Sequence, residues 1–123
     1  MILVDTSVWI EHLRRGVPDL VRRLDAGEVL GHPLVTGELA MGNLGNRAEV
    51  LGWLQSLPQA TVANDAEVMA IIEIHRLHGE GIGFADAHLL ASTMLSDDAR
   101  LWTQDRRLQA CAARLDVASL GLR

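Results

Sequence analysis

Four acidic residues stand at positions where their side chains could carry out metal-dependent chemistry. Each lies where an apolar segment ends or a predicted helix begins; they are Asp5, Glu38, Asp86 and Asp105. In open sheets of parallel strands, side chains at the carboxyl ends of the strands converge on one crevice. Carboxylates held that close together repel one another unless a cation or protons neutralise them. The spacing therefore predicts a shared site for a divalent cation.

Hard oxygen ligands of this kind suit Mg²⁺ or Mn²⁺, which also keep several waters and accept substrate phosphate oxygens. Such a site can activate a water for in-line attack on a phosphodiester and stabilise the departing oxygen. Thr6, Ser7 and Thr103 are predicted to hydrogen-bond to the carboxylates or to metal-bound waters. We therefore predict a metal-dependent nuclease in which the four acids are both the metal ligands and the catalytic residues.

Each acid also has a purely structural interpretation. Asp5 and Asp105 could serve only as N-caps, for which Asp is an ordinary residue, and Glu38 could be a solvated helix residue. Asp86 is harder to explain in this way, because it interrupts an apolar helix start after a glycine-rich loop. One shared site accounts for all four positions more simply than four independent roles.

The hydrophobic pattern predicts strands and helices that alternate along the chain. Strands are expected at residues 1–4, 28–31, 61–63, 100–103 and 117–120. Helices are expected at 6–15, 18–26, 34–41, 50–57, 65–78, 84–94 and 106–115, with Asn64 or Asp65 capping the fifth and Gly79 ending it. The alternation predicts an α/β protein, with a three-layer α/β/α fold around a central parallel sheet of four to five strands.

Length and composition predict a single domain over residues 1–123. The chain has a mass of 13.4 kDa and is 49% hydrophobic, which is enough to bury a core. One cysteine, Cys111, cannot form an internal disulfide, and the apolar start ends at Asp5 without a preceding basic stretch. We therefore expect a cytoplasmic protein with neither a secretory signal nor a membrane span.

The charge pattern bears on binding to nucleic acid. The net charge is −5 and all 11 basic residues are arginines, so bound cations would have to offset part of the field that an RNA or DNA phosphate meets. Three adjacent pairs, Arg14/Arg15, Arg22/Arg23 and Arg106/Arg107, are either local phosphate contacts or ordinary solvated helix faces. The sequence leaves both interpretations open.

Other motifs give weaker indications. His75 and His78 have no Cys or His partner at zinc spacing, and Ser7 lacks the glycine elbow of serine hydrolases. The loop 79–83 has three glycines but lacks the lysine of a phosphate-binding loop. These features do not support zinc, serine hydrolase or nucleotide chemistry.

Four segments carry the acids in a recurring order. They are Ile2-Leu3-Val4-Asp5-Thr6-Ser7-Val8-Trp9-Ile10, Val35-Thr36-Gly37-Glu38-Leu39, Gly81-Ile82-Gly83-Phe84-Ala85-Asp86-Ala87-His88-Leu89-Leu90-Ala91 and Leu101-Trp102-Thr103-Gln104-Asp105. In the order and spacing of these segments, and in total length, the chain resembles the PIN-domain ribonucleases and, among them, the VapC toxins of bacterial toxin–antitoxin pairs. The resemblance extends over essentially the whole chain.

The resemblance implies a Mg²⁺- or Mn²⁺-dependent endoribonuclease toxin in which Asp5, Glu38, Asp86 and Asp105 are the active-site acids. It implies a structured RNA substrate, such as tRNA or rRNA, and a homodimer. It also implies neutralisation by a cognate VapB-like antitoxin, with operator DNA bound only through that antitoxin.

Three other protein classes share parts of this pattern. A phosphorelay receiver domain needs a lysine at its acidic site, and the chain has no lysine. A haloacid-dehalogenase-like phosphatase needs a second Asp two residues after the first, where this chain has Ser7. A catalytically inactive PIN-like module that acts as a binding or regulatory partner remains the alternative.

Overall fold

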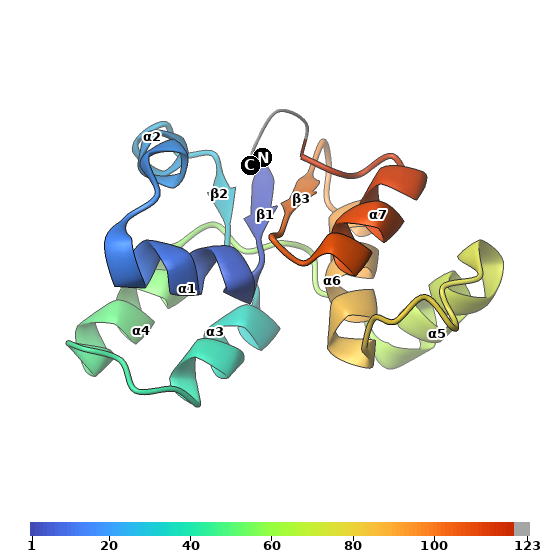
Figure 1. Cartoon of the computed structure of the whole chain (residues 1–123), viewed down its shortest axis with the longest axis horizontal. Coiled ribbons are helices and arrows are strands. Elements are labelled where there is room, and N and C mark those ends of the chain that lie inside the picture. The colour runs from blue at the N-terminus through green and yellow to red at the C-terminus, as the bar shows by residue number, and fades with distance from the viewer. Residues whose placement is uncertain (120–123) are drawn as a thin grey trace.

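A computed structural model describes residues 1–119 of the chain (Figure 1). The elements of this part are β1 (Ile2–Val4), α1 (Thr6–Arg15), α2 (Pro18–Asp25), β2 (Val29–Leu30), α3 (Pro33–Ala40), α4 (Arg47–Ser56), α5 (Asp65–His75), α6 (Phe84–Leu95), β3 (Arg100–Trp102) and α7 (Arg106–Arg114). The α/β class and the alternation of strands and helices are confirmed. Within residues 1–119, no helix is long and apolar enough to cross a membrane.

The sheet is parallel, with β1 between β2 and β3. Ile2 pairs with Val29 on one side and with Arg100 on the other, so the two registers place the ends of the three strands at the same level. The strands are short apolar runs, and β1 and β2 are buried along their whole length. Covering a parallel sheet on both faces requires such continuous apolar runs. The chain places β2 on one side of β1 and β3 on the other, and α/β sheets form ligand crevices at such a switch point.

The prediction of four to five strands was wrong for the described part of the chain, which has three. At 61–63 the backbone N–H of Ala63 donates to the hydroxyl of Ser92 on α6, and that of Thr61 donates to the hydroxyl of Ser96, which follows α6, so neither pairs with a neighbouring strand. Gly31 and Gln59 form an isolated parallel bridge nearby.

The expected edge strand at 117–120 is likewise reduced to an isolated bridge. Ala118 bridges Leu101 in parallel on the outer edge of β3, and hydrogen bonds from Leu101 N–H to Val117 O and from Ser119 N–H to Leu101 O support it. Leu120, the last residue of that prediction, lies outside the described residues. Within the described residues 117–119, pairing with β3 is limited to this bridge.

Capping residues explain where the helices begin. Asp5 caps α1 by accepting a hydrogen bond from Thr6 N–H, and Asn64 forms a capping box with Glu67 at the start of α5. The prediction that α5 runs to Gly79 was wrong. The helix stops at His75, because Arg76 adopts a left-handed conformation with φ of 53°.

The helices form two groups beside the sheet (Figure 1). Helices α1 to α4 gather on the β2 side, and α5 to α7 gather on the β3 side. The carboxyl ends of the strands point into the region between the two groups. Segments far apart in the sequence, the starts of α1 and α7, are thereby brought to the same end of the sheet.

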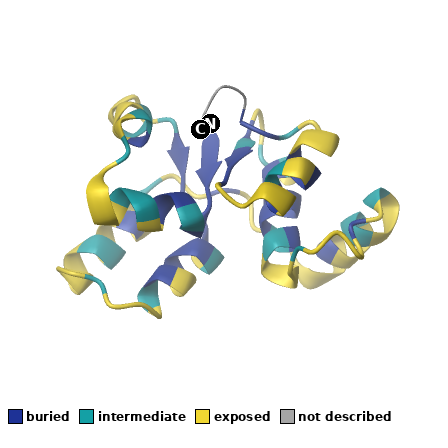
Figure 2. Ribbon diagram, viewed as in Figure 1, coloured by how far each residue is buried: buried dark blue, intermediate teal, exposed yellow. Residues whose placement is uncertain are grey.

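The core follows the sheet and the helix faces that cover it (Figure 2). Its largest fully buried side chains include Trp9 of α1, Trp102 of β3 and Leu90 of α6. Trp9 also stacks edge-on against Trp53 of α4, with ring centroids 5.5 Å apart. The indole rings of Trp9 and Trp53 therefore join α1 to α4, and burial of large aromatic and aliphatic side chains stabilises the core.

A buried polar link joins the two groups of helices behind the sheet ends. His32 is completely buried, and its Nδ1 accepts from Leu34 N–H at 3.0 Å as the N-cap of α3. Its Nε2 therefore carries the proton and donates to Ser92 Oγ of α6 at 2.9 Å. Burial lowers the pKa of His32 to about 4, with a smaller contribution from the nearby His88. The imidazole is thus neutral at pH 7, as this hydrogen-bond pattern requires.

We predict that Ser92→Ala lowers the free energy of unfolding by about 1–3 kcal/mol, because it leaves both His32 Nε2–H and Ala63 N–H buried without an acceptor. Urea denaturation measures this loss. Ser56→Ala is the control, since Ser56 bonds only to a backbone carbonyl at an exposed position and should change stability by less than about 0.5 kcal/mol. Equal free energies of unfolding for Ser92→Ala and wild type would show that the hydrogen bonds of Ser92 do not stabilise the fold.

Candidate active site

Asp5 is the buried member of the four acids, with only 7% of its surface exposed. It directly follows β1, and its N–H bonds to Trp102 O at 2.9 Å. Its Oδ1 accepts from Thr6 N–H at 2.7 Å, while its Oδ2 accepts from Ser7 Oγ at 2.9 Å and from Thr103 Oγ1 at 2.6 Å. Three of about four acceptor positions on the carboxylate are therefore occupied, which fixes its orientation.

Thr103 connects Asp5 to Asp105. The Thr103 hydroxyl donates to Asp5 and accepts from Asp105 N–H at 3.1 Å. Asp105 is exposed and caps α7, its Oδ1 accepting from Leu108 N–H at 3.0 Å. Asp5 and Asp105 are thus both N-caps, as the structural interpretation predicted. Capping uses only one carboxylate oxygen of Asp105, however. The other oxygen makes no hydrogen bond within residues 1–119.

Asp86 lies in the first turn of α6. Its Oδ2 accepts from Gly83 N–H at 3.2 Å, at the end of the glycine-rich loop. The positive end of the helix dipole favours a carboxylate here. The side chain is half-buried, so part of the solvation that would otherwise stabilise its charge is lost.

Glu38 lies on α3, but in its last turn and not near a helix start as the sequence suggested. A carboxylate at the negative end of a helix has no help from the dipole. Glu38 is exposed and makes no hydrogen bond of good geometry within residues 1–119. The Thr6 hydroxyl faces it closely enough to favour its charged form, yet Thr6 Oγ1 is itself buried without a hydrogen-bond partner in the described part of the chain.

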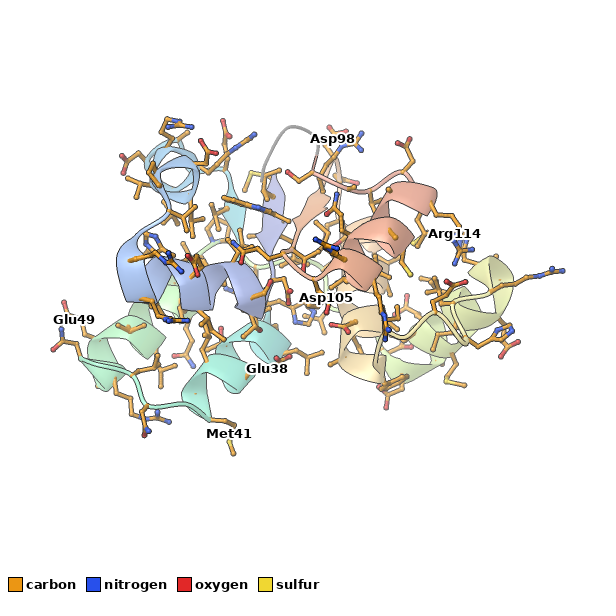
Figure 3. The ribbon with its side chains drawn as sticks, in the orientation of Figure 1. Glu38, Met41, Glu49, Asp98, Asp105 and Arg114 are labelled. Carbon is orange, nitrogen blue, oxygen red and sulfur yellow. The ribbon has the colours of Figure 1, made fainter. Side chains whose placement is uncertain are left out.

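Electrostatics show that the four acids influence one another. Partial burial raises the pKa of Glu38, and the charges of Asp5 and Asp86 raise it further against the opposing effect of Thr6. Burial likewise raises the pKa of Asp86, with the bond from Gly83 opposing and the charges of Asp5 and Asp105 adding to the rise. Figure 3 shows Glu38 and Asp105 in the central region beyond the strand ends. Glu38 thus lies within electrostatic range of Asp5 and Asp86, and Asp86 within range of Asp5 and Asp105; we call these four side chains the acidic cluster.

The cluster is open. Within residues 1–119, no three Asp, Glu, His or Cys side chains stand close enough together to enclose a metal ion by themselves. The donor set still suits Mg²⁺ or Mn²⁺, since these ions are usually held by one or two carboxylates and complete their shell with water and phosphate oxygens. The raised pKa values of Glu38 and Asp86 and the unpartnered Thr6 hydroxyl are what a cation and its waters would relieve.

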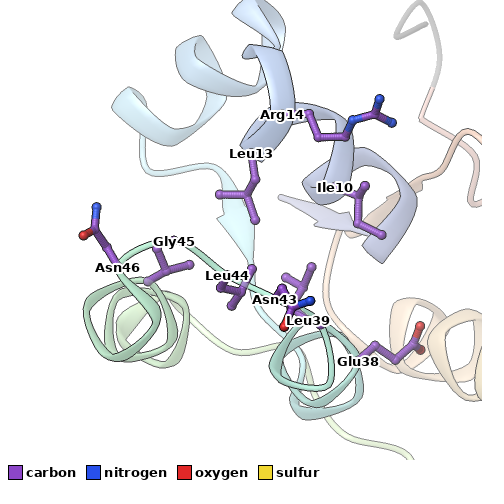
Figure 4. A pocket seen from close by; sticks show the side chains of 11 residues that line it. Ile10, Leu13, Arg14, Glu38, Leu39, Asn43, Leu44, Gly45 and Asn46 are labelled. Atoms are coloured by element: carbon purple, nitrogen blue, oxygen red, sulfur yellow. The ribbon is translucent and has the colours of Figure 1, made fainter.

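A pocket of about 540 Å³ adjoins the acidic cluster (Figure 4). It lies between α1 and the segment from α3 to α4, and its walls include Leu13, Leu39 and Leu44. Glu38 and Arg14 stand at its edge and extend toward the same side. The pocket is therefore continuous with the acidic cluster at Glu38.

Two residues that help to position the acids were not singled out in the sequence. His32 and Ser92 link α3, which carries Glu38, to α6, which carries Asp86. The available signals were weak: a histidine directly before Pro33, and a serine inside an otherwise apolar helix. Neither signal indicates a partner, because the two residues are far apart in the chain.

Comparison with known proteins identifies the family. The family model described as "PIN domain" matches residues 2–114. Ribonuclease VapC32 of Mycobacterium tuberculosis, from strain CDC 1551 / Oshkosh and from strain ATCC 25618 / H37Rv, is 49% identical over 118 residues, which cover 96% of this chain and 95% of each relative. The chain therefore belongs to the PIN-domain family and is a VapC-type member of it.

We predict that Glu38→Gln stabilises the metal-free protein near neutral pH. The folded-state pKa of Glu38 lies above its ordinary value of 4.5, so ionisation costs stability as the pH rises from 4.5 through the raised pKa. Because Glu38 is exposed, solvent screening limits the gain in the free energy of unfolding to about 0.3 kcal/mol. Urea unfolding in EDTA at several pH values measures it.

The advantage of Glu38→Gln should shrink as the pH falls to the ordinary value of 4.5. Glu73→Gln is the matched control, because Glu73 is an exposed helix residue on α5 that is not among the groups acting on Glu38. A variant less stable than wild type at neutral pH would argue against electrostatic repulsion within the acidic cluster.

Proposed function

We propose that this PIN-domain protein is a metal-dependent endoribonuclease that hydrolyses RNA phosphodiester bonds. The observation that carries the proposal is the mutual influence of four carboxylates from four separate elements, two of them with raised pKa values. The ribonuclease name of the 49% identical relatives supports the same reaction. Asp5, Glu38, Asp86 and Asp105 are the proposed metal-binding and catalytic residues.

The residues of the proposed site have different roles in the reaction. Asp5 is held by three hydrogen bonds and supplies a fixed ligand, while Glu38 and Asp105 are exposed and can meet substrate and its waters. Ser7 and Thr103 keep the Asp5 carboxylate from rotating, and the buried Thr6 hydroxyl faces Glu38 without a hydrogen-bond partner in the described part of the chain. Bound Mg²⁺ or Mn²⁺ would supply Lewis-acid stabilisation and a more acidic water. An aspartate or glutamate of the acidic cluster that does not hold the ion would be placed to hold the proton that such a water loses.

The biological role that we propose follows from the VapC-type membership. The protein acts as the toxin of a toxin–antitoxin pair in the cytoplasm, cutting a structured RNA such as tRNA or rRNA. A VapB-like antitoxin neutralises it, and a net charge of −5 suits a partner that approaches the acids with a basic segment. A homodimer, and operator DNA bound only through the antitoxin, are part of the same proposal.

The alternative is a catalytically inactive module that binds a partner through the same surface. The raised pKa values of Glu38 and Asp86 support the catalytic account, because groups with perturbed pKa values gather at active sites. The distinction is experimental and needs only a cleavage assay.

We predict that Asp5→Asn reduces Mg²⁺- or Mn²⁺-dependent cleavage of total RNA by at least about 100-fold, which corresponds to roughly 2.7 kcal/mol of transition-state stabilisation. The amide keeps the acceptor for Thr6 N–H, so α1 should remain capped while the charge is lost. Gel analysis of RNA incubated with metal, and with EDTA, measures the effect.

Asp25→Ala serves as the control for this assay, since Asp25 lies in the last turn of α2 and is exposed. It should cut RNA at the wild-type rate. Cleavage that is equal in wild type and Asp5→Asn, or that persists in EDTA, would remove the metal-dependent reaction and leave the binding module as the better account.

A further inference from the structure

The structure separates the arginines into two kinds. Within residues 1–119, five form ion pairs with acids: Arg15 with Glu11, Arg22 with Asp19, Arg23 with Glu28, Arg100 with Asp116 and Arg114 with Glu80. The adjacent pairs of the sequence therefore have different roles. Arg22 and Arg23 both have acidic partners, whereas in Arg14/Arg15 only Arg15 has one. In Arg106/Arg107 neither residue has an acidic partner in the described part of the chain.

Arg107 is held over the loop that leads to Asp86. A Cβ on Gly81 would come within 2.7 Å of both Arg107 Cδ and Nη1, so the side chain lies directly against this glycine. Arg107 stands two residues after Asp105, in the first turn of α7. Its guanidinium is therefore seated between the segments that carry two of the four acids, and it stays exposed.

Arg14 lines the same pocket as a third acid, Glu38. It is exposed on α1, the helix that follows Asp5, and it borders the pocket at whose edge Glu38 lies. Figure 4 shows both side chains extending toward the same side. Because α1 belongs to the β2 side of the molecule and α7 to the β3 side, Arg14 and Arg107 are carried by opposite groups of helices (Figure 1).

An exposed arginine without an acidic partner is suited to a phosphate. Its guanidinium loses no internal ion pair when it binds, and it can donate two parallel hydrogen bonds to phosphate oxygens. An acidic protein repels an RNA backbone, so a few local cations near the reacting phosphate have a large influence on where the strand lies.

We propose that Arg14 and Arg107 each bind one backbone phosphate of the RNA, on either side of the acidic cluster, and so fix the strand across it. The inference rests on the proposed function, because it assumes that RNA is the substrate. Gly81 is part of this arrangement, since its missing side chain leaves the space that the Arg107 guanidinium fills. Arg15 and Arg114 are engaged with acids and do not contact the strand.

Binding without cleavage tests the proposal. Fluorescence anisotropy of an unstructured, fluorescein-labelled RNA is measured in EDTA over a series of salt concentrations. Arg14→Ala and Arg107→Ala should each weaken binding roughly five- to tenfold and lower the slope of log affinity against log salt by about 0.7, the value for one phosphate on a single strand. Arg107→Lys should restore the slope, because it keeps the charge.

Matched controls lie on the same helices. Arg15→Ala, next to Arg14 on α1, and Arg114→Ala, on α7 with Arg107, should retain the wild-type slope and affinity. Unchanged slopes for Arg14→Ala and Arg107→Ala, in a protein that still cuts RNA with metal, would overturn this inference alone. Absence of both RNA binding and cleavage in the wild type would overturn it together with the proposed function.

Discussion

The hydroxyl of Thr103 is the contact on which the acidic cluster depends. It donates to Asp5 Oδ2 at 2.6 Å and accepts from Asp105 N–H at 3.1 Å, so one side chain joins the ends of the two strands that meet where the sheet order reverses. The parallel registers of β1 and β3 bring those ends level. Without this bridge the Asp5 carboxylate, buried among apolar strands, would keep fewer of the donors that a buried charge requires.

Holding the acids together has an electrostatic cost that the fold itself does not remove. Burial and neighbouring carboxylates raise the pKa of Asp86, and Glu38, at the unfavourable end of its helix, is affected in the same direction. The buried link between His32 and Ser92 keeps α3 and α6, the helices of these two acids, at a fixed separation. A cation would stabilise such a rigid frame of mutually repelling carboxylates, and in the proposed reaction the same frame would orient that cation.

Much of the fold and of the site could be predicted because the signals are local. Asp5 follows an apolar run and precedes a helix, and Asp86 interrupts an apolar helix start, so both were placed correctly without coordinates. Strand number was not predictable, because the hydroxyls of Ser92 and Ser96, in α6 and directly after it, accept the hydrogen bonds from the N–H groups of residues 61 and 63 that a strand would have used. The partners of His32 and of Arg107 lie far away in the sequence, and only the packing of helices decides them.

The proposed reaction requires that four carboxylates distant in the chain share one divalent cation. Paramagnetic broadening of backbone amide signals during a titration with Mn²⁺ detects such a shared site. The amides next to Asp5, Glu38, Asp86 and Asp105 should broaden together at the lowest Mn²⁺ concentrations and recover when excess Mg²⁺ is added. Broadening that is confined to one of these segments, or that begins at acids elsewhere on the surface, would contradict the claim.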